Sequence, residues 1–149
     1  MTNPILRRDF LNRTALGGIG LAAATSSLGF AADDKPSERV VVGVMGLSRG
    51  RSLATQFAKQ PNVEVKYLCD VDSTRAESCV ADVEKIGNSK PQAIGDFRQI
   101  LDDKAVDALI CAAPNHWHAP ATILACKAGK HVYVEKPCCH SPREGELMI

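Results

Sequence analysis

Short apolar segments alternate with longer amphipathic segments from residue 39 to the end of the chain. A run of a few residues that is almost wholly apolar is typical of a strand covered on both faces. Such runs occur at residues 39–45, 63–69, 92–94, 106–112 and 131–135, the third being the weakest. Because helical segments separate these runs, the pattern predicts an α/β fold with a doubly wound parallel sheet.

Helices are predicted between the strands, where apolar residues recur every three or four positions. The expected helices cover residues 48–59, 73–86, 96–101 and 120–127. Gly87 and Gly129 stand just past two of them, where a left-handed residue commonly ends a helix. Residues 141–144 (Ser-Pro-Arg-Glu) have the pattern of a capping box with an early proline. A further helix starts there, and we expect the domain to be incomplete, its last strand lying beyond Ile149.

The first 31 residues do not fit the alternating pattern. Arg7 and Arg8 precede a weakly apolar stretch, residues 15–28, which glycine, serine and threonine interrupt. Small residues then occupy the two positions that a signal peptidase reads, the second being Ala31. These features resemble a twin-arginine (Tat) export signal with cleavage after Ala31. We therefore expect a signal peptide at residues 1–31, a polar linker at residues 32–38 and the folded domain at residues 39–149.

The apolar part of this signal is shorter than the run of about 20 residues that spans a bilayer. We therefore expect no stable membrane span, the alternative being an N-terminal amphipathic or membrane helix. The expected partner is the Tat export machinery, and the expected location is the periplasm.

Composition and charge narrow the possible partners. A net charge of +1, without a run of basic residues, gives no sign of a nucleic-acid partner. Cysteines within predicted strands and helices are commonly small buried apolar residues, and a protein folded in the reducing cytoplasm gains nothing from disulfides. We expect no structural disulfide among the six cysteines, Cys69, Cys79, Cys111, Cys126, Cys138 and Cys139.

A glycine-containing turn follows the first predicted strand and opens the first predicted helix. Its sequence is Gly46-Leu47-Ser48-Arg49-Gly50. Unpaired amides at a helix N-terminus attract phosphate, and glycines let the backbone approach it closely. The turn is a version of the G-x-G-x-x-G fingerprint that is one residue shorter, with serine at position 48. It predicts a site for a dinucleotide pyrophosphate.

Asp70 strengthens this prediction. It ends the second predicted strand, 20 residues beyond Gly50, where dinucleotide-binding units place the acid that binds the adenosine ribose hydroxyls. Its charge opposes a 2′-phosphate and favours NAD, although Arg75 nearby keeps NADP possible. The alternative is that Asp70 caps the next helix or stabilises a turn.

The same turn also matches G-x-S-x-G, the nucleophile elbow of α/β-hydrolases, with Ser48 as the nucleophile. Two features count against a hydrolase. The elbow normally follows several strands, whereas here it follows the first, and a hydrolase has no use for Asp70 at the tip of the second.

Two later segments carry the most specific signal in the chain. They read Ala-Ala-Pro-Asn-His-Trp-His at residues 112–118 and Ala-Gly-Lys-His-Val-Tyr-Val-Glu-Lys-Pro at residues 128–137. With them, the chain resembles the Gfo/Idh/MocA family of oxidoreductases over residues 39–149. The resemblance implies an NAD(P)-binding Rossmann domain followed by a second α/β domain. It also implies hydride transfer at a secondary alcohol or ketone of a sugar, an inositol or a similar polyol.

The resemblance assigns roles around the fifth predicted strand. Lys136 matches the family's active-site lysine, which would hydrogen-bond the reacting oxygen and assist proton transfer. The tip of a strand facing the ligand crevice suits that task. Glu135 and Pro137 would hold the strand end and shape the nicotinamide pocket. The alternative for Lys136 is an exposed lysine at the end of a strand.

The resemblance also assigns the loop after the fourth predicted strand to the cofactor crevice. It implies that Pro114, Asn115 and His118 line it, with Asn115 and His118 touching the nicotinamide ribose or the substrate. His118 alternatively neighbours the N-cap of the following helix. Trp117 is expected to be a lid or packing residue.

Histidines and cysteines also follow neighbouring predicted strands, which raises a zinc site as an alternative. Its ligands would come from His116, His118, Cys138, Cys139 and His140, since thiolate and imidazole bind zinc well. Adjacent cysteines suit a tetrahedral site poorly, and no CxxC or HxxxH spacing occurs. We therefore assign no metal.

The sequence thus predicts the dinucleotide-binding part of an exported oxidoreductase, inactive alone and homo-oligomeric at full length. Because free nicotinamide nucleotide is expected to be lacking in the periplasm, we expect NAD to be bound tightly before export. Two alternatives remain open: a glycosidase that uses bound NAD for a transient oxidation, and a dinucleotide-binding module without catalysis.

Overall fold

The computed structural model describes residues 39–87 and 89–149, which belong to one compact unit. The predicted signal peptide at residues 1–31 and linker at residues 32–38 lie outside the described residues. No helix in the described ranges is both long and apolar enough to cross a membrane.

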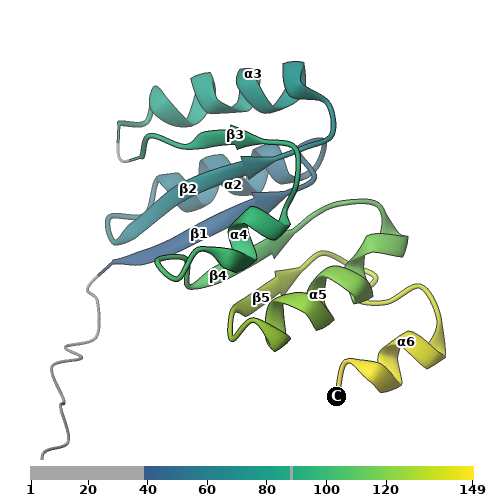
Figure 1. Cartoon of the computed structure of the whole chain (residues 1–149). Coiled ribbons are helices and arrows are strands. Elements are labelled where there is room, and N and C mark those ends of the chain that lie inside the picture. The colour runs from purple at the N-terminus through teal and green to yellow at the C-terminus, as the bar shows by residue number, and fades with distance from the viewer. Residues whose placement is uncertain (1–38, 88) are drawn as a thin grey trace, which may run out of the picture. The chain divides into compact units, whose positions relative to one another are not determined.

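Five parallel strands form one sheet, in the order β3-β2-β1-β4-β5 (Figure 1). The strands are β1 (Val40–Met45), β2 (Val63–Cys69), β3 (Gln92–Ile94), β4 (Ala108–Cys111) and β5 (His131–Val134). The chain builds the sheet outward from β1 to β3, then crosses back to place β4 on the other side of β1. This is the order of a Rossmann-type doubly wound sheet. The predicted fold class is confirmed.

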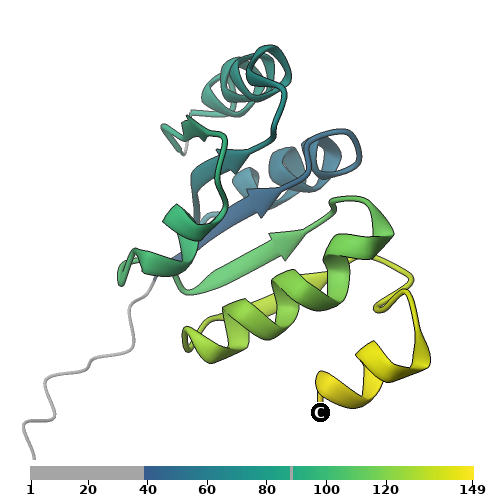
Figure 2. The same cartoon turned by 45° about the vertical axis from the view of Figure 1, so that its right-hand side comes forward.

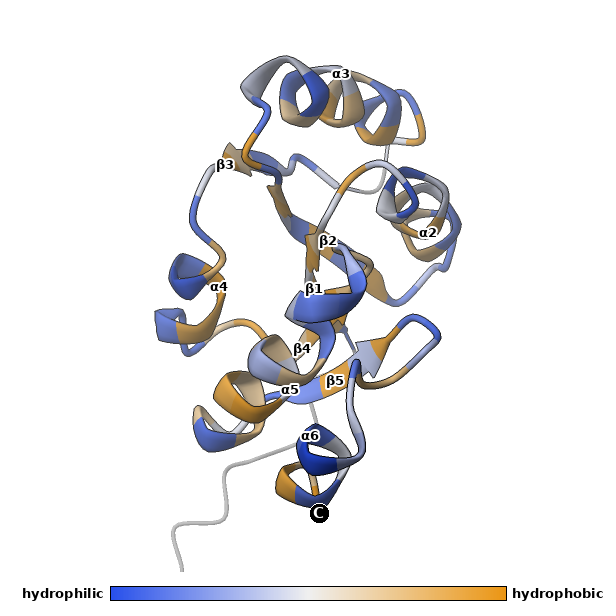
Figure 3. Cartoon of the chain, turned by 90° about the vertical axis from the view of Figure 1, so that its right-hand side faces the viewer, coloured by the Kyte–Doolittle hydropathy of each residue, from blue (hydrophilic) through white to orange (hydrophobic). Residues whose placement is uncertain are grey.

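Helices cover both faces of the sheet. The helical elements are α2 (Gly50–Ala58), α3 (Ser73–Glu84), α4 (Arg98–Asp102), the short 3₁₀ helix η1 (Asn115–Trp117), α5 (His118–Lys127) and α6 (Pro142–Leu147). Figure 3 shows α2 and α3 on one side of the sheet, with α4 and α5 on the other. The turned view in Figure 2 also shows α4 and α5 on a common side. Because strand–helix–strand crossovers are right-handed, the reversal of strand order after β3 places the later helices on the other face.

Each face of the sheet has its own apolar core, because alternate strand residues point to opposite faces. Val44 and Leu68 are fully buried among side chains of α2 and α3. Leu109 and Cys111 are fully buried on the other face, among side chains of α4 and α5 such as Ile100. The central strands are therefore covered on both sides, which explains their almost wholly apolar sequences.

The predicted elements agree with the structure closely, including β2 and β3, whose bounds match. Gly87 and Gly129 adopt positive φ angles of 86° and 74° after their helices. The capping box forms, with the Ser141 hydroxyl accepting from the Glu144 amide and the Glu144 carboxylate accepting from the Ser141 amide. One expectation was wrong: Cys126 lies on α5 as predicted, but it is exposed.

Candidate functional site

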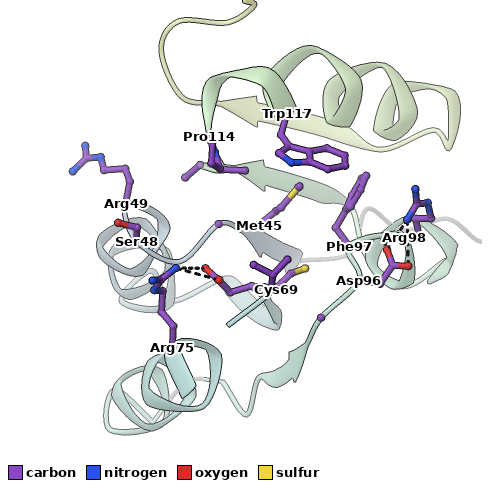
Figure 4. A pocket seen from close by; sticks show the side chains of 16 residues that line it. Met45, Ser48, Arg49, Cys69, Arg75, Asp96, Phe97, Arg98, Pro114 and Trp117 are labelled. Atoms are coloured by element: carbon purple, nitrogen blue, oxygen red, sulfur yellow. Dashed lines mark hydrogen bonds and ion pairs between the residues drawn. The ribbon is translucent and has the colours of Figure 1, made fainter. Parts of the chain in front are cut away.

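The carboxyl ends of the five parallel strands lie along one edge of the sheet. The strand order reverses between β1 and β4. In open parallel sheets, ligands bind in the crevice at this point. A cavity of about 700 Å³ lies there, with an apolar floor and charged rims (Figure 4). Its walls come from the loops after β1 to β4. They comprise Met45, Gly46, Ser48, Arg49, Cys69, Asp70, Val71, Arg75, Gly95, Asp96, Phe97, Arg98, Ala112, Ala113, Pro114 and Trp117.

The turn after β1 passes tightly against the chain that follows β4. Gly46 has φ +85°, and a Cβ there would lie 2.4 Å from the Ala113 backbone. A Cβ at Gly50 would lie 3.0 Å from a Val44 methyl group, which is also tight. Gly46 therefore lets the turn after β1 lie directly against the backbone after β4, and Gly50 lets α2 start close to the Val44 side chain. Gly46, the first glycine of the predicted turn, is thus required by its positive φ angle and by the Ala113 backbone beside it.

Helix α2 starts at this turn with no side-chain cap. The Gly50 amide donates to the Gly46 carbonyl at 3.0 Å, closing the turn. Within residues 39–87 and 89–149, no hydrogen bond involves the amides of Ser48 and Arg49. Because the first amides of a helix need partners from outside it, these two groups are available to an anion at the edge of the cavity.

Asp70 is joined directly to the glycine turn. Its Oδ2 accepts the Leu47 amide proton at 2.7 Å, and its Oδ1 accepts from the Asp72 amide at 3.0 Å. The residue is only 8% exposed, yet it lines the cavity. Leu47 itself is 1% exposed, so its side chain packs in the core while its amide fixes the acid. Asp72, not Asp70, is the N-cap of α3, so the capping role suggested for Asp70 was wrong, whereas its bond to the Asp72 amide does stabilise a turn.

The Asp70 carboxylate is held in its charged form. Burial raises its pKa, but the amides of Asp72 and Leu47 and the Arg75 guanidinium outweigh burial and keep the pKa below its ordinary value. Arg75 Nη1 lies 3.2 Å from Asp70 Oδ1 and 3.4 Å from Oδ2 (Figure 4). Arg75 Nη2 also lies 3.6 Å from Asp72 Oδ2. The guanidinium is thus shared between two acids at the rim.

An aromatic pair forms the opposite wall of the cavity. Figure 4 shows Phe97 next to Trp117, and the two rings pack edge to face with centroids 6.0 Å apart and planes at 70°. Phe97 is buried, and Arg98 packs over its ring while pairing with Asp96 at 3.2 Å. Trp117, expected as a lid or packing residue, packs on Phe97 and is 38% exposed.

Lys136 follows β5 and is exposed, outside the cavity walls. The peptide bond between Lys136 and Pro137 is cis. Glu135 connects this strand end to the glycine turn, since its Oε1 lies 3.1 Å from Arg49 Nε. The hydrogen bond from the Arg49 guanidinium lowers the pKa of the Glu135 carboxyl. Burial raises this pKa, but by less. The strand end with the proposed catalytic lysine is thereby linked to the cavity.

His118 makes a second link, of a kind the sequence did not predict. Its Nδ1 lies 2.5 Å from the Pro137 carbonyl oxygen, and its Nε2 lies 2.8 Å from the Ala113 carbonyl oxygen. The side chain is 1% exposed. Both ring nitrogens are therefore occupied by the protein, and the expected contact with ribose or substrate does not fit this geometry. His118 opens α5, as the alternative for it proposed, and joins the β4 and β5 loops.

The predicted site residues thus divide into two sets. Cavity walls include Gly46, Ser48, Arg49, Asp70 and Pro114. The remaining predicted residues lie outside these walls and are Leu47, Gly50, Asn115, His118, Glu135, Lys136 and Pro137. Among these, Asn115 is exposed within η1.

Sequence reasoning missed the wall built by Phe97 and Arg98. Helix periodicity identified Phe97 only as a core residue. The available signal was position: the segment 95–98 directly follows β3, and the end of every parallel strand reaches the same crevice.

The two rival sites gain no support from this geometry. Ser48 is exposed, and within the described part of the chain it has no hydrogen bond to a histidine or an acid. No group of three or more His, Cys, Asp or Glu residues among those described is placed to hold a metal ion. Both ring nitrogens of His118, one of the suggested zinc ligands, contact backbone carbonyl oxygens instead.

Comparison with known proteins identifies the family. Residues 38–149 match the family described as an oxidoreductase family with an NAD-binding Rossmann fold. The chain belongs to the Gfo/Idh/MocA family. The family match covers every element of the described domain.

Curated relatives of this Gfo/Idh/MocA chain include glycosyl hydrolase family 109 proteins. One, from Saccharopolyspora erythraea, is 31% identical over 156 residues, covering 91% of this chain and 34% of the relative. An α-N-acetylgalactosaminidase from Shewanella oneidensis is 31% identical over 154 residues, covering 89% of this chain and 34% of the relative. The chain therefore spans about one third of the length of these relatives.

Solved structures of dehydrogenases share the fold. A myo-inositol dehydrogenase from Lactobacillus casei, in complex with NAD(H) and myo-inositol, has a TM-score of 0.67 at 23% identity, covering 74% of this chain and 32% of that one. A levoglucosan dehydrogenase in complex with NADH has a TM-score of 0.61 at 27% identity, covering 74% and 31%. A 3-ketoreductase from Actinomadura kijaniata, in complex with NADP, has a TM-score of 0.61 at 25% identity, covering 74% and 34%.

Proposed function

We propose that this domain binds NAD in the cavity between the glycine turn and the Phe97–Trp117 wall. The pyrophosphate lies against the amides of Ser48 and Arg49, and the adenosine ribose hydroxyls donate to Asp70. The observation that carries this proposal is the 2.7 Å hydrogen bond from the Leu47 amide to Asp70. It fixes the acid beside the phosphate-binding turn, as dinucleotide recognition requires.

The residues present fit the cofactor. The close packing of the glycine turn on the Ala113 backbone depends on the missing Cβ of Gly46, and the first amides of α2 have no side-chain cap. A cavity of about 700 Å³ with an apolar floor suits a large ligand with flat rings. Arg49 on the rim, next to the Ser48 amide, supplies positive charge near the phosphates.

Asp70 also supports a preference for NAD over NADP. A charged carboxylate held by two amides repels a 2′-phosphate at the position of the ribose hydroxyl. Arg75 does not offset this charge freely, because Asp70 and Asp72 share its guanidinium. NADP binding would require Arg75 to leave both acids.

The proposed chemistry is hydride transfer from a secondary alcohol carbon of a sugar, inositol or similar polyol. The bound nicotinamide supplies the hydride acceptor. Lys136 binds the substrate hydroxyl oxygen and takes up its proton, which general base catalysis requires as the carbon loses hydride. The Arg49–Glu135 ion pair and the contact of His118 with the Pro137 carbonyl hold the strand end that carries Lys136 next to the cavity.

The activity belongs to the whole protein, of which this chain covers a part. We propose a second, substrate-binding domain after residue 149, export by the Tat machinery to the periplasm, and a homo-oligomer at full length. Alignment with the Saccharopolyspora erythraea protein covers 91% of the chain. Because residues 39–149 make up less than that share, the similarity extends into the predicted signal and linker.

A second candidate function is glycoside cleavage through a transient oxidation that regenerates NAD. It is favoured by the curated relatives, which are named as glycosyl hydrolase family 109 proteins or an α-N-acetylgalactosaminidase. In that reaction Lys136 would act on the same hydroxyl oxygen. Net reduced nicotinamide would not accumulate.

One experiment separates the two functions. The natural full-length protein is incubated with NAD and either free sugars and polyols or chromogenic glycosides, and NADH absorbance and released aglycone are followed. Net NADH without glycoside cleavage supports the dehydrogenase, and aglycone release without net NADH supports the glycosidase. In either case Lys136→Ala should lower turnover by about 10²–10⁴-fold. Exposed Lys127→Ala is the matched control, and equal rates for the two variants would contradict the role of Lys136.

A further inference from the structure

Two adjacent cysteines follow the proposed catalytic lysine, with only Pro137 between. Cys138 is exposed and Cys139 is half-buried, and their sulfur atoms lie 4.0 Å apart. Cys126 is also exposed, but within the described residues it makes no sulfur–sulfur contact. The pair is therefore the place in the described domain where two accessible thiols meet.

This segment is fixed on both sides. Before it, the Pro137 carbonyl contacts His118 Nδ1 at 2.5 Å. After it, the amides of His140 and Ser141 donate to Glu144 Oε2 at 2.6 and 3.0 Å. With both flanks held, a change in the peptide between the cysteines is transmitted to Pro137 and Lys136.

The backbone determines what kind of bond the two sulfurs can form. Disulfides usually join Cα atoms about 4.4–6.8 Å apart, whereas neighbouring Cα atoms across a trans peptide are about 3.8 Å apart. A bond between adjacent cysteines is therefore strained, and strained, exposed disulfides are the easily reduced, regulatory kind. A permanent structural bridge is not expected here.

The two thiols also differ in reactivity. Burial, followed by the neighbouring Cys138 sulfur, raises the pKa of the Cys139 thiol above its ordinary value. Thiolate is the attacking species in disulfide exchange. Exposed Cys138 is thus the first thiol to meet an oxidant, and Cys139 is the resolving thiol.

We propose that Cys138 and Cys139 form a reversible vicinal disulfide that lowers the turnover carried by Lys136. A small disulfide, RSSR, is the oxidant. The Cys138 thiolate attacks one of its sulfurs, giving a mixed disulfide and releasing RS⁻. The Cys139 thiolate then attacks the Cys138 sulfur, forming the Cys138–Cys139 bond and releasing the second RS⁻. The two cysteine protons pass to the two leaving thiolates, so two thiols are oxidised and one disulfide is reduced to two RSH.

Peptide mapping tests the bond itself. The natural full-length protein is treated with oxidised glutathione without denaturant, and remaining thiols are alkylated before proteolysis and mass spectrometry. The peptide with Cys138 and Cys139 should lose two hydrogens and carry neither glutathione nor alkyl group, and a dithiol reductant should restore it. Cys126, the matched lone thiol, should retain glutathione. Glutathione persisting on Cys138 beside an alkylated Cys139 would overturn the proposal.

Two variants assign the order of attack. Cys139→Ser should trap glutathione on Cys138, because the resolving thiol is gone. Cys138→Ser should leave Cys139 mostly alkylated. The reverse pattern would contradict Cys138 as the first thiol.

The effect on turnover rests on the proposed function. The oxidised protein should lose most of its turnover and regain it on reduction, whereas the Cys138→Ser/Cys139→Ser variant should keep turnover under oxidant. Full turnover by protein that carries the mapped bond would overturn the regulatory link. Mapping requires no substrate, so failure of the disulfide and failure of the proposed function give different results.

Discussion

Gly46 has no room for a side chain. Its backbone is left-handed, and the Ala113 backbone occupies the place where a Cβ would lie. Gly129 offers a comparison, because its φ of +74° is similar but nothing lies within 4 Å of a Cβ there. The two glycines separate the effect of backbone conformation from that of close packing.

Alanine at these positions should therefore have different effects. Gly129→Ala should cost about 1–2 kcal/mol in unfolding free energy, since only the left-handed conformation is penalised. Gly46→Ala should cost clearly more and weaken NADH binding, because β1 and the chain after β4 must separate. Urea denaturation and calorimetry measure both. Equal costs for the two variants would mean that close approach at Gly46 is unimportant.

His118 contributes by holding two carbonyl groups. Replacing it with alanine leaves the Pro137 and Ala113 oxygens without this partner and opens a buried space. We expect His118→Ala to lower unfolding free energy by about 2 kcal/mol or more. His116→Ala is the matched control, since His116 is exposed two residues earlier and should change stability little. Equal unfolding midpoints for the two variants would contradict the positioning role.

At the scale of elements, the end of the sheet away from the cavity is held by the turn between α4 and β4. Asp103 Oδ2 accepts from Lys66 at 2.5 Å and from the Tyr67 hydroxyl at 2.9 Å, joining this turn to β2. Its backbone carbonyl accepts from Lys130 at 2.7 Å, joining it to the turn before β5. This turn thus ties three strands together.

These contacts make stability depend on acid pH. Lys66 first, then the Ala105 amide, lower the pKa of Asp103 from 3.8 to about 2. Since the folded-state pKa is below the unfolded value, the stabilisation is full above pH 4 and is lost as pH falls toward 2. Asp103→Asn should flatten this part of the pH profile of unfolding free energy. Asp102→Asn, which removes the same charge from an exposed neighbour, should keep the wild-type slope, and a flattened slope there would contradict the assignment.

At the scale of the whole molecule, the sequence predicted the elements well because each element is locally consistent. Apolar strands, Gly87, Gly129 and the Ser141–Glu144 box all carry their signal within a few residues. The glycine turn and Asp70 were predicted from spacing in the same way. Contacts between distant loops were not predicted, because no local pattern shows that His118 reaches Pro137 or that Phe97 packs against Trp117. Those depend on how the ends of β3, β4 and β5 meet.

The most direct test of the account is calorimetric titration of the purified protein with NADH. Wild type should bind one NADH per chain. Asp70→Asn should weaken binding by roughly tenfold to a hundredfold, the effect of losing a hydrogen bond to a charged group. Asp72→Asn should leave the Kd nearly unchanged, because asparagine caps α3 as well as aspartate does. No binding by wild type, or equal Kd values for the two variants, would contradict the placement of NAD between the glycine turn and Asp70.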